Sequence, residues 1–233
     1  MPQRKLDRSL IRDLSIFRSM TDEDLDAVLS TASARQVADG KTVFEQGQTA
    51  TEFFALLHGR LKVVQTTVDG QQVVVRHVSP GDIFGIARAM RRTDFPATAI
   101  AVVDSLMLAW PSSQWESFIA RSPVLAMNAL QTVGQRLQDA HTRIRELSTE
   151  EVERRVAHAL LRLVQQAGRK TDEGILIDFP ITRQDIAEMT GTTLHTVSRV
   201  MTGWEAKGLV ASARKKVLVK DAHKLHVLAE KPE

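Results

Sequence analysis

The sequence predicts an α+β protein with a small β-barrel or roll in its first half and a helix-turn-helix near its C-terminus. Three observations carry this prediction. Short β-rich runs separated by turn residues fill residues 34–111, an apolar stripe of helical period follows at 124–147, and two short helical patterns flank Gly191. The chain has 233 residues, which is enough for one large domain or two small domains with real cores.

The region before the β-rich segment is expected to be helical. Apolar side chains recur at helical spacing through residues 7–33. Thr21 is followed three positions later by Asp24, a pattern typical of a capping box that opens a helix.

The β-rich segment contains one strong hairpin signal. Residues 61–68 and 71–78 are two β-rich runs, and between them lies the dipeptide Asp69-Gly70. Asp-Gly between such runs is typical of a two-residue turn that joins antiparallel strands. Further short runs with glycine and proline between them favour a closed roll of several strands.

The long helix expected from about Val124 to Leu147 carries a regular apolar seam. The seam residues are spaced by four and three positions in alternation, and they are Ala126, Leu130, Val133, Leu137, Ala140, Ile144 and Leu147. A strict period of 3.5 residues favours packing against a partner helix, so this seam is a predicted dimer interface. The alternative is that the helix packs with this face on its own N-terminal domain.

A break at residues 148–150 is expected to separate the seam helix from a second helix over 150–167. Residues 168–174 are expected to form a polar turn, and 175–181 and 209–219 to form the strands of a wing. The second helix has an apolar stripe that includes Val152, Val156, Leu160 and Val164.

The helix-turn-helix is indicated by its caps and its turn. Thr182 and Asp185 form a second capping-box pattern, which predicts the start of the first helix. Gly191 permits the sharp turn, and Thr192 or Thr193 can cap the helix that follows.

The second helix of this motif has two distinct faces. An apolar stripe is expected to be buried, and it consists of Leu194, Val197, Met201 and Trp204. The opposite face carries His195, Ser198 and Arg199 at positions i, i+3 and i+4, so their side chains converge on one patch. Donors on a short exposed helix suit the major groove of DNA, where base edges offer acceptors.

The charge is concentrated beside this motif. The formal net charge is +3, whereas residues 199–224 contain seven Lys or Arg and two acids, a local excess of five. A solvated basic tail would explain this excess, but its place next to a helix-turn-helix favours contact with DNA phosphates.

Composition excludes several other classes of protein. The chain contains no cysteine, which excludes disulfides, cysteine-bound zinc and a cysteine-held iron–sulfur cluster. No apolar run of 18 residues predicts a membrane span, and residues 1–14 lack the apolar core of a signal peptide. We therefore expect a cytoplasmic protein. No nucleophile elbow, P-loop, metal-ligand set or dinucleotide fingerprint indicates an enzyme.

The C-terminal motif resembles the winged helix of the CRP/FNR superfamily of bacterial transcription regulators. The matching words are I-T-R-Q-D-I-A at 181–187, T-V-S-R at 196–199 and G-L-V at 208–210, with Gly191 between the helices. The resemblance implies a homodimer that binds double-stranded DNA at palindromes of the sequence TTG-N8-CAA. It also implies a contact with RNA polymerase.

The resemblance also implies roles for individual residues. Arg199 would read a guanine and Ser198 a neighbouring base, whereas His195 stands where the family usually has glutamate. The positions implied to lie near DNA phosphates are those of Arg183, Gln184, Thr193 and Thr196.

The N-terminal half resembles the jelly-roll sensor domain of the same superfamily, which is related to cyclic-nucleotide-binding domains. The matching words are F-x-x-G at 44–47, L-L-H-G-R-L-K-V at 56–63 and P-G-D-I-F-G at 80–85. We therefore expect a sensor domain over 1–120, a dimerisation helix over 121–148 and a DNA-binding domain over 149–233.

The expected effector is not cyclic AMP. Relatives that bind cyclic AMP carry G-E-L and then R-S-A, whose Glu and Arg hold the ribose and the phosphate. This chain has G-I-A at 85–87 and P-A-T-A at 96–99, so both charged groups are missing. Short words at 85–90, 95–99, 108–110 and 193–199 resemble the NnrR branch, whose members activate denitrification genes in response to nitric oxide.

Relatives that sense diatomic gases can bind haem, often through histidine. The haem-ligand candidates in this chain are His58, His77, His141 and His158. For each of them an ordinary hydrogen-bonded histidine is the alternative. The alternative function is a regulator of other genes that has no cofactor of its own or responds to another small molecule.

Overall fold

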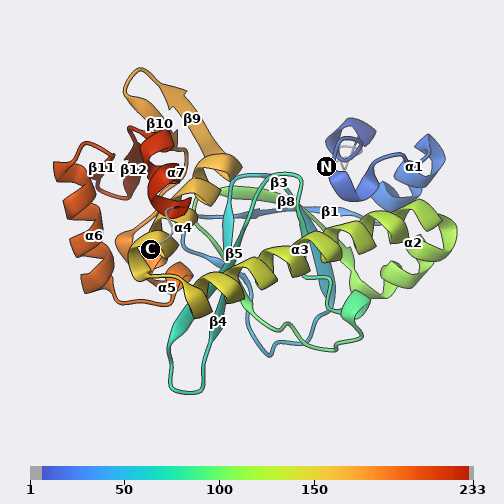
Figure 1. The fold of residues 1–233 in the computed structure, drawn as a ribbon. Helices are drawn as coiled ribbons and strands as arrows, with labels where there is room; N and C mark the ends of the chain where they lie inside the picture. The colour runs from blue at the N-terminus through green and yellow to red at the C-terminus, as the bar shows by residue number, and fades with distance from the viewer. Residues whose placement is uncertain (1–6, 231–233) are drawn as a thin grey trace. The chain divides into compact units, whose positions relative to one another are not determined.

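The computed structural model describes residues 7–230, and the chain divides into two compact units (Figure 1). The first unit contains the residues up to Thr66 together with 76–139, and the second contains 67–75 and the residues from Ala140 onward. The long helix α3 (Pro123–Thr149) contributes to both units. The expected division into three parts had instead set this helix apart.

The N-terminal region is less helical than its spacing predicts. Two short 3-10 turns, η1 (Arg8–Leu10) and η2 (Ser15–Phe17), precede helix α1 (Asp22–Ser30). Ser19 has a left-handed backbone with φ 64°, which interrupts any right-handed helix between η2 and α1. The predicted cap is present, because the Thr21 side chain accepts a hydrogen bond from the Asp24 amide.

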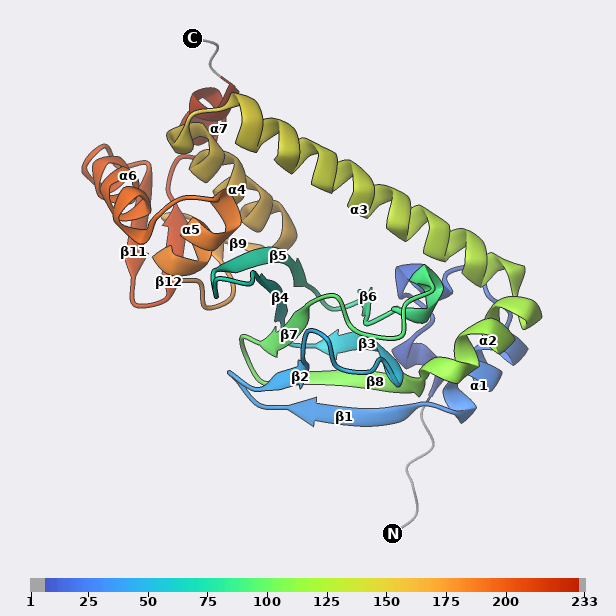
Figure 2. The same cartoon turned by 90° about the horizontal axis from the view of Figure 1, so that it is seen from below.

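The first unit is built on two four-stranded antiparallel sheets, which confirms the predicted β-roll (Figure 2). One sheet has the order β1 (Ser33–Val37), β8 (Ser105–Pro111), β3 (Glu52–His58) and β6 (Ile83–Phe84). The other has the order β2 (Thr42–Phe44), β7 (Thr98–Ala101), β4 (Leu61–Thr66) and β5 (Gln72–Val78). The short turn η3 (Arg88–Met90) lies between β6 and β7.

Strand β3 is buried on both faces, which explains its nearly continuous apolar sequence. Phe53 and Ala55 belong to a core cluster shared with α1 and α2 (Trp115–Arg121), whereas Phe54 and Leu56 belong to the cluster between the two sheets. Successive side chains of a strand point to opposite faces, so one strand can supply both cores.

The predicted hairpin between β4 and β5 has a longer loop than expected. The Thr67 carbonyl accepts from the Gly70 amide at 3.0 Å, and the Thr67 amide donates to the Gln71 carbonyl at 2.9 Å. These bonds enclose the three loop residues Val68, Asp69 and Gly70, and Gly70 has φ 83°. Asp-Gly therefore forms the end of a three-residue loop with a left-handed glycine, rather than a two-residue turn.

Helix α3 follows η4 (Ser112–Gln114) and α2, and its two faces differ. Leu125 and Ala129 are buried in the core of the first unit, and the Asn128 amide donates to the carbonyls of Ile16 and Arg18. The seam lies on another face: Leu130 to Leu147 are exposed at every seam position, and Ala126 is half-buried. Within the first unit, the seam is therefore not used for packing on the sensor domain.

The second unit contains helices α4 (Val152–Ala167), α5 (Arg183–Thr190), α6 (Leu194–Ala206) and α7 (Ala222–Glu230). Its sheet has the order β11 (Val210–Ala213), β12 (Lys216–Val219), β10 (Gly174–Ile177) and β9 (Gly168–Thr171). Strand β9 falls where a polar turn was predicted. All four of its residues are exposed, so no apolar alternation signals this edge strand in the sequence.

The apolar stripe of α4 is close to the predicted one but not identical. Val156 and Leu160 are fully buried, whereas Val152 and Val164 are half-buried and Leu163 takes the deeper position. Within residues 7–230, no helix has the length and apolarity that crossing a membrane requires.

Candidate DNA-binding surface

The first helix of the helix-turn-helix is capped at both ends as the sequence predicts. The Thr182 side chain accepts from the Asp185 amide at 3.0 Å, and the Asp185 carboxylate accepts from the Thr182 amide at 2.9 Å. Gly191 ends α5 with φ 60°, in the left-handed region that favours glycine. A Cβ at Gly191 would also lie 3.0 Å from the Leu147 side chain. The turn therefore requires a glycine.

Thr193, rather than Thr192, caps the second helix. Its hydroxyl accepts from the Thr196 amide at 3.1 Å and lies 3.0 Å from the Thr196 hydroxyl. Both hydroxyls thus lie at the N-terminal end of α6, where unpaired helix amides favour anions.

Helix α6 presents the predicted polar patch. His195 and Arg199 are exposed and Ser198 is half-buried, whereas the opposite stripe of Val197, Met201 and Trp204 is buried. Leu194 was predicted to belong to this stripe, but it is 47% exposed because it is the first residue of the helix, where the chain turns away from the core.

Polar contacts that the sequence did not predict hold α6 in place at two of its residues, Trp204 and Glu205. The Trp204 indole donates to the Glu153 carboxylate on α4 at 2.7 Å. At the C-terminal end of α6, the Glu205 carboxylate accepts from Arg183 on α5 at 3.1 Å. The Ser212 hydroxyl on β11 donates to the same carboxylate and accepts from Arg183 at 3.1 Å.

The Arg183 contacts qualify the role that the resemblance implies for it. The Arg183 guanidinium was expected near DNA phosphates, yet here it connects α5, α6 and the wing strand β11. Its side chain remains 31% exposed. Gln184, the other α5 residue expected near phosphates, is exposed and donates to Glu188.

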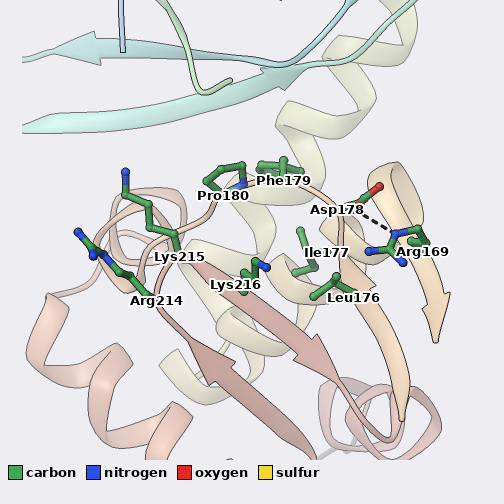
Figure 3. A pocket seen from close by; sticks show the side chains of 9 residues that line it. All are labelled: Arg169, Leu176, Ile177, Asp178, Phe179, Pro180, Arg214, Lys215 and Lys216. Carbon is green, nitrogen blue, oxygen red and sulfur yellow. Dashed lines mark hydrogen bonds and ion pairs between the residues drawn. The ribbon is translucent and has the colours of Figure 1, made fainter. Parts of the chain in front are cut away.

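The wing turn brings three cations together at residues 214–216. Lys215 has a left-handed backbone with φ 58°, and the Lys215 carbonyl accepts from the Ile181 amide at 3.0 Å. Side chains of this turn border a cavity of about 530 Å³, together with Phe179 and Pro180 (Figure 3). At another edge of the same cavity, Arg169 pairs with Asp178.

A second cavity of about 410 Å³ is lined by Arg183, Ser212 and residues 214–216. The basic turn therefore borders both cavities, and its three cationic residues are exposed.

The junction of α3 and α4 contains a polar cluster that the sequence did not reveal. Glu146 is only 4% exposed and pairs with Arg162 at 2.6 Å. One helical turn later, the Glu150 carboxylate lies 3.4 Å from the His158 imidazole. These pairs join the end of the seam helix to the first helix that follows it.

The histidines considered as haem ligands do not gather at one place. His58 ends β3 and is exposed, His141 is exposed on α3, and His77 is buried in β5. His158 contacts a carboxylate, as described above. Neither cavity of the second unit is lined by a histidine. Across residues 7–230, no three His, Cys, Asp or Glu side chains gather as a metal site.

The interior of the β-roll is also filled. The rings of Phe44 and Phe95 stack at 3.8 Å, and Phe54 and Phe84 stack at 5.2 Å. A haem needs an apolar slot beside its ligand. The histidines in the described chain therefore do not fit a haem site in this conformation.

Two family models match the chain. The cyclic nucleotide-binding domain matches residues 34–122, and the Crp-like helix-turn-helix domain matches residues 154–228. The chain is 30% identical over 214 residues to the cyclic AMP receptor protein of Thermus thermophilus, an alignment that covers 92% of this chain and 96% of that protein.

More distant relatives agree with these matches. The transcriptional activator protein FnrA of Stutzerimonas stutzeri is 24% identical over 212 residues, which cover 91% of this chain and 86% of FnrA. The structure of FixK2 from Bradyrhizobium japonicum superposes with a TM-score of 0.76 at 20% identity, covering 87% of this chain and 99% of FixK2.

A β-roll followed by a long helix and a winged helix-turn-helix defines a DNA-binding transcription regulator with a sensor domain. The relatives are transcription regulators and not enzymes. This chain is likewise a regulator and not an enzyme. The chain belongs to the CRP/FNR family, whose members bind DNA and typically act as homodimers.

Proposed function

We propose that the chain is a homodimeric regulator, acting mainly as an activator, that binds TTG-N8-CAA palindromes through α6. The observation that carries this proposal is the exposed patch of His195 and Arg199 on a helix that is capped, braced and buried on its other face. A rigid helix with exposed donors can enter a major groove, and a two-fold dimer would place two such helices one turn of DNA apart.

Arg199 is the residue best suited to read a base. Its guanidinium can bond both O6 and N7 of guanine, and the side chain is exposed on α6. Ser198 would contact the neighbouring base. His195 stands where the family usually has glutamate, whose carboxylate accepts a hydrogen bond from cytosine N4. The base preference at this position would therefore differ from that of relatives with glutamate.

Phosphate contacts would position α6. Thr193 caps α6 and Thr196 lies in its first turn, Gln184 is exposed at the start of α5, and the wing turn carries three cations. Arg183 would reach a phosphate only by leaving Glu205, because its guanidinium is already paired in the free protein.

The Arg183 pair gives a testable prediction. We expect Glu205→Gln to steepen the salt dependence of DNA binding by about one unit of slope for each half-site, because Arg183 becomes available to a phosphate. The pair is about one-third exposed, so the expected loss of unfolding free energy is about 1 kcal/mol or less. The measurement is fluorescence anisotropy at several salt concentrations.

Glu173→Gln is the control for this change, since it removes the same charge from an exposed turn outside α5 and α6. A Glu205→Gln variant with weaker binding and an unchanged salt slope would contradict the prediction. Arg183 would then only hold α6 in position.

The exposed seam of α3 supports the homodimer. Leu130, Leu137 and Ile144 are 65%, 55% and 60% exposed, and a continuous apolar stripe on a long helix is unfavourable in water. Knobs-into-holes packing against the same seam of a second chain would bury it.

The proposed signal is nitric oxide, and the proposed targets are denitrification genes, on the basis of the NnrR-like words in the sequence. Cyclic AMP is not proposed as the effector, because the segments 85–87 and 96–99 contain the buried apolar side chains Ile86 and Ala97 in place of the charged Glu and Arg that hold the nucleotide in relatives. Activation would require contact with RNA polymerase. The alternative is a regulator of other genes with no cofactor or with another effector.

The test is anisotropy of a labelled TTG-N8-CAA duplex at fixed salt under strict anaerobiosis, before and after nitric oxide, with and without added haem. Specific binding is expected in every case. A tenfold rise with nitric oxide, about 1.4 kcal/mol of coupling, would support the proposed signal. Equal affinity in all states would overturn nitric oxide gating and favour the alternative effector. Absence of preference for the palindrome would overturn the DNA site.

A further inference from the structure

The sheet of the second unit has a less buried face that is apolar at its centre. On β12, Val217 and Val219 are buried, whereas Leu218 between them is half-buried. Side chains paired directly across an antiparallel ladder lie on the same face, so the partners of Leu218 mark the face that it occupies. The row that crosses this face from β11 to β9 consists of Ala211, Leu218, Leu176 and Arg169.

The cavity of about 530 Å³ reaches this row at Leu176 (Figure 3). Its apolar lining also contains Ile177, Phe179 and Pro180, of which Ile177 and Phe179 are buried and Pro180 is half-buried. Cavities that hold small molecules commonly have about 300–1,000 Å³ and combine apolar side chains with a few polar groups. The size of this cavity and its four apolar side chains therefore fit a small molecule with an apolar body.

The charged side chains around the cavity are unbalanced. The lining contains the four cations Arg169, Arg214, Lys215 and Lys216 and one acid, Asp178. Arg169 and Asp178 pair at 3.2 Å at one end of the cavity, and Figure 3 shows Arg214 and Lys215 at the other end. The three cations of the wing turn are exposed, so the edge of a partly apolar cavity carries positive charge.

We propose that this cavity binds a small aromatic carboxylic acid. The aromatic body lies against Leu176 and Pro180, where contact removes apolar surface from water. The carboxylate points to the wing turn, where lysine or arginine donates a charge-assisted hydrogen bond to it. A neutral ligand would gain nothing from the cations, and an inorganic anion would gain nothing from the apolar lining.

Duplex DNA does not match the whole of this cavity. Its phosphates can contact the wing turn, but its bases are stacked inside the duplex, so it has no free apolar group to place against Leu176 and Pro180. Every residue that lines the cavity lies between 169 and 216. The site therefore uses no part of the β-roll.

The ligand and DNA would share the wing turn. This consequence rests on the function proposed above, because it assumes that residues 214–216 contact phosphates when DNA is bound. A carboxylate held by these side chains leaves less positive charge for the DNA backbone. Binding of the ligand therefore weakens DNA binding, and DNA weakens ligand binding by the same factor.

The test uses the full chain and 2-naphthoate as the probe, in isothermal titration calorimetry at neutral pH and constant ionic strength. Two comparison probes each lack one of the required groups. The first, 2-naphthamide, has the ring system without the charge, and acetate has the charge without the ring system. We expect saturable binding of 2-naphthoate and at least about tenfold weaker binding of each comparison probe, a difference of about 1.4 kcal/mol.

Two substitutions assign the binding to this cavity. Leu176→Ser removes apolar contact from the lining and is expected to weaken 2-naphthoate binding about tenfold. Lys216→Glu replaces an attracting charge with a repelling one and is expected to weaken it about fivefold, since exposed charges are screened. Lys216 is exposed, so this second variant is expected to fold even where Leu176→Ser fails to do so.

Each substitution has a matched control in β12 or directly after it. Leu218→Ser changes the residue that pairs with Leu176 on the same face but does not line the cavity. Lys220→Glu makes the same change of charge at an exposed lysine outside the lining. Both controls are expected to bind 2-naphthoate like the wild type. The site would be overturned by a wild type that shows no saturable binding, by equal binding of 2-naphthamide, or by binding that Leu176→Ser and Lys216→Glu leave unchanged.

DNA binding separates this inference from the proposed function. In anisotropy titrations at fixed salt, 2-naphthoate is expected to weaken palindrome binding by the wild type and to weaken it less for Leu176→Ser. Saturable binding of 2-naphthoate without an effect on DNA affinity would overturn the competition and leave the site. Saturable binding by a protein that shows no preference for the palindrome would overturn the DNA proposal alone.

Discussion

Replacement of Leu137 by glutamate is expected to convert the protein from a dimer to a monomer and to abolish tight binding to a palindrome. Leu137 is 55% exposed in the single chain and lies in the middle of the seam, where two copies would face each other. The change removes about 2 kcal/mol of apolar burial from each chain and places two carboxylates against one another. Size-exclusion chromatography with light scattering measures the outcome.

Gln138→Glu is the matched control for this change. It introduces the same side chain one position later on α3, at an exposed residue outside the seam. We expect this variant to remain a dimer and to bind DNA. A Leu137→Glu protein that stays dimeric would show that the exposed seam is not the interface.

Replacement of Arg199 by alanine is expected to cost about 1–3 kcal/mol of specific DNA binding and to relax preference at the guanine that it reads. The side chain is exposed on α6 and contributes little to the core, so the melting temperature should change little. Anisotropy titrations against the cognate palindrome and against duplexes with that guanine replaced measure both effects.

Arg199→Lys separates charge from base reading. Lysine keeps the attraction to phosphates but lacks the planar fork of arginine, so non-specific affinity should persist while discrimination falls. Unchanged affinity of Arg199→Ala for the cognate palindrome would refute the base-reading role. Equal loss on every duplex would instead indicate a phosphate contact.

The helix-turn-helix was predictable because its signals are local. Thr182 and Asp185 cap α5 through bonds between residues three apart, and Gly191 takes the left-handed turn that follows. Thr193 caps α6 in the same way. Such interactions depend on neighbouring residues only, so the one-dimensional pattern contains them.

The predictions that failed concern elements whose limits depend on packing. The N-terminal region has helical spacing, yet Ser19 adopts a left-handed backbone and Ile16 and Phe17 enter the core from a 3-10 turn. Strand β9 has four exposed residues and forms because β10 offers it hydrogen-bond partners. Neither a single left-handed residue nor an exposed edge strand produces a periodic pattern of apolar residues in the sequence.

The residue order of this chain was sufficient to indicate a β-roll, a seam helix and a capped recognition helix with its exposed donors. Tertiary structure alone decided that Arg183 pairs with Glu205, that Trp204 bonds Glu153, and that β10 and the wing turn line one cavity. The physical reason is range. Caps, turns and amphipathic stripes arise between residues a few positions apart, whereas ion pairs and shared acceptors join residues that only the folded core brings together.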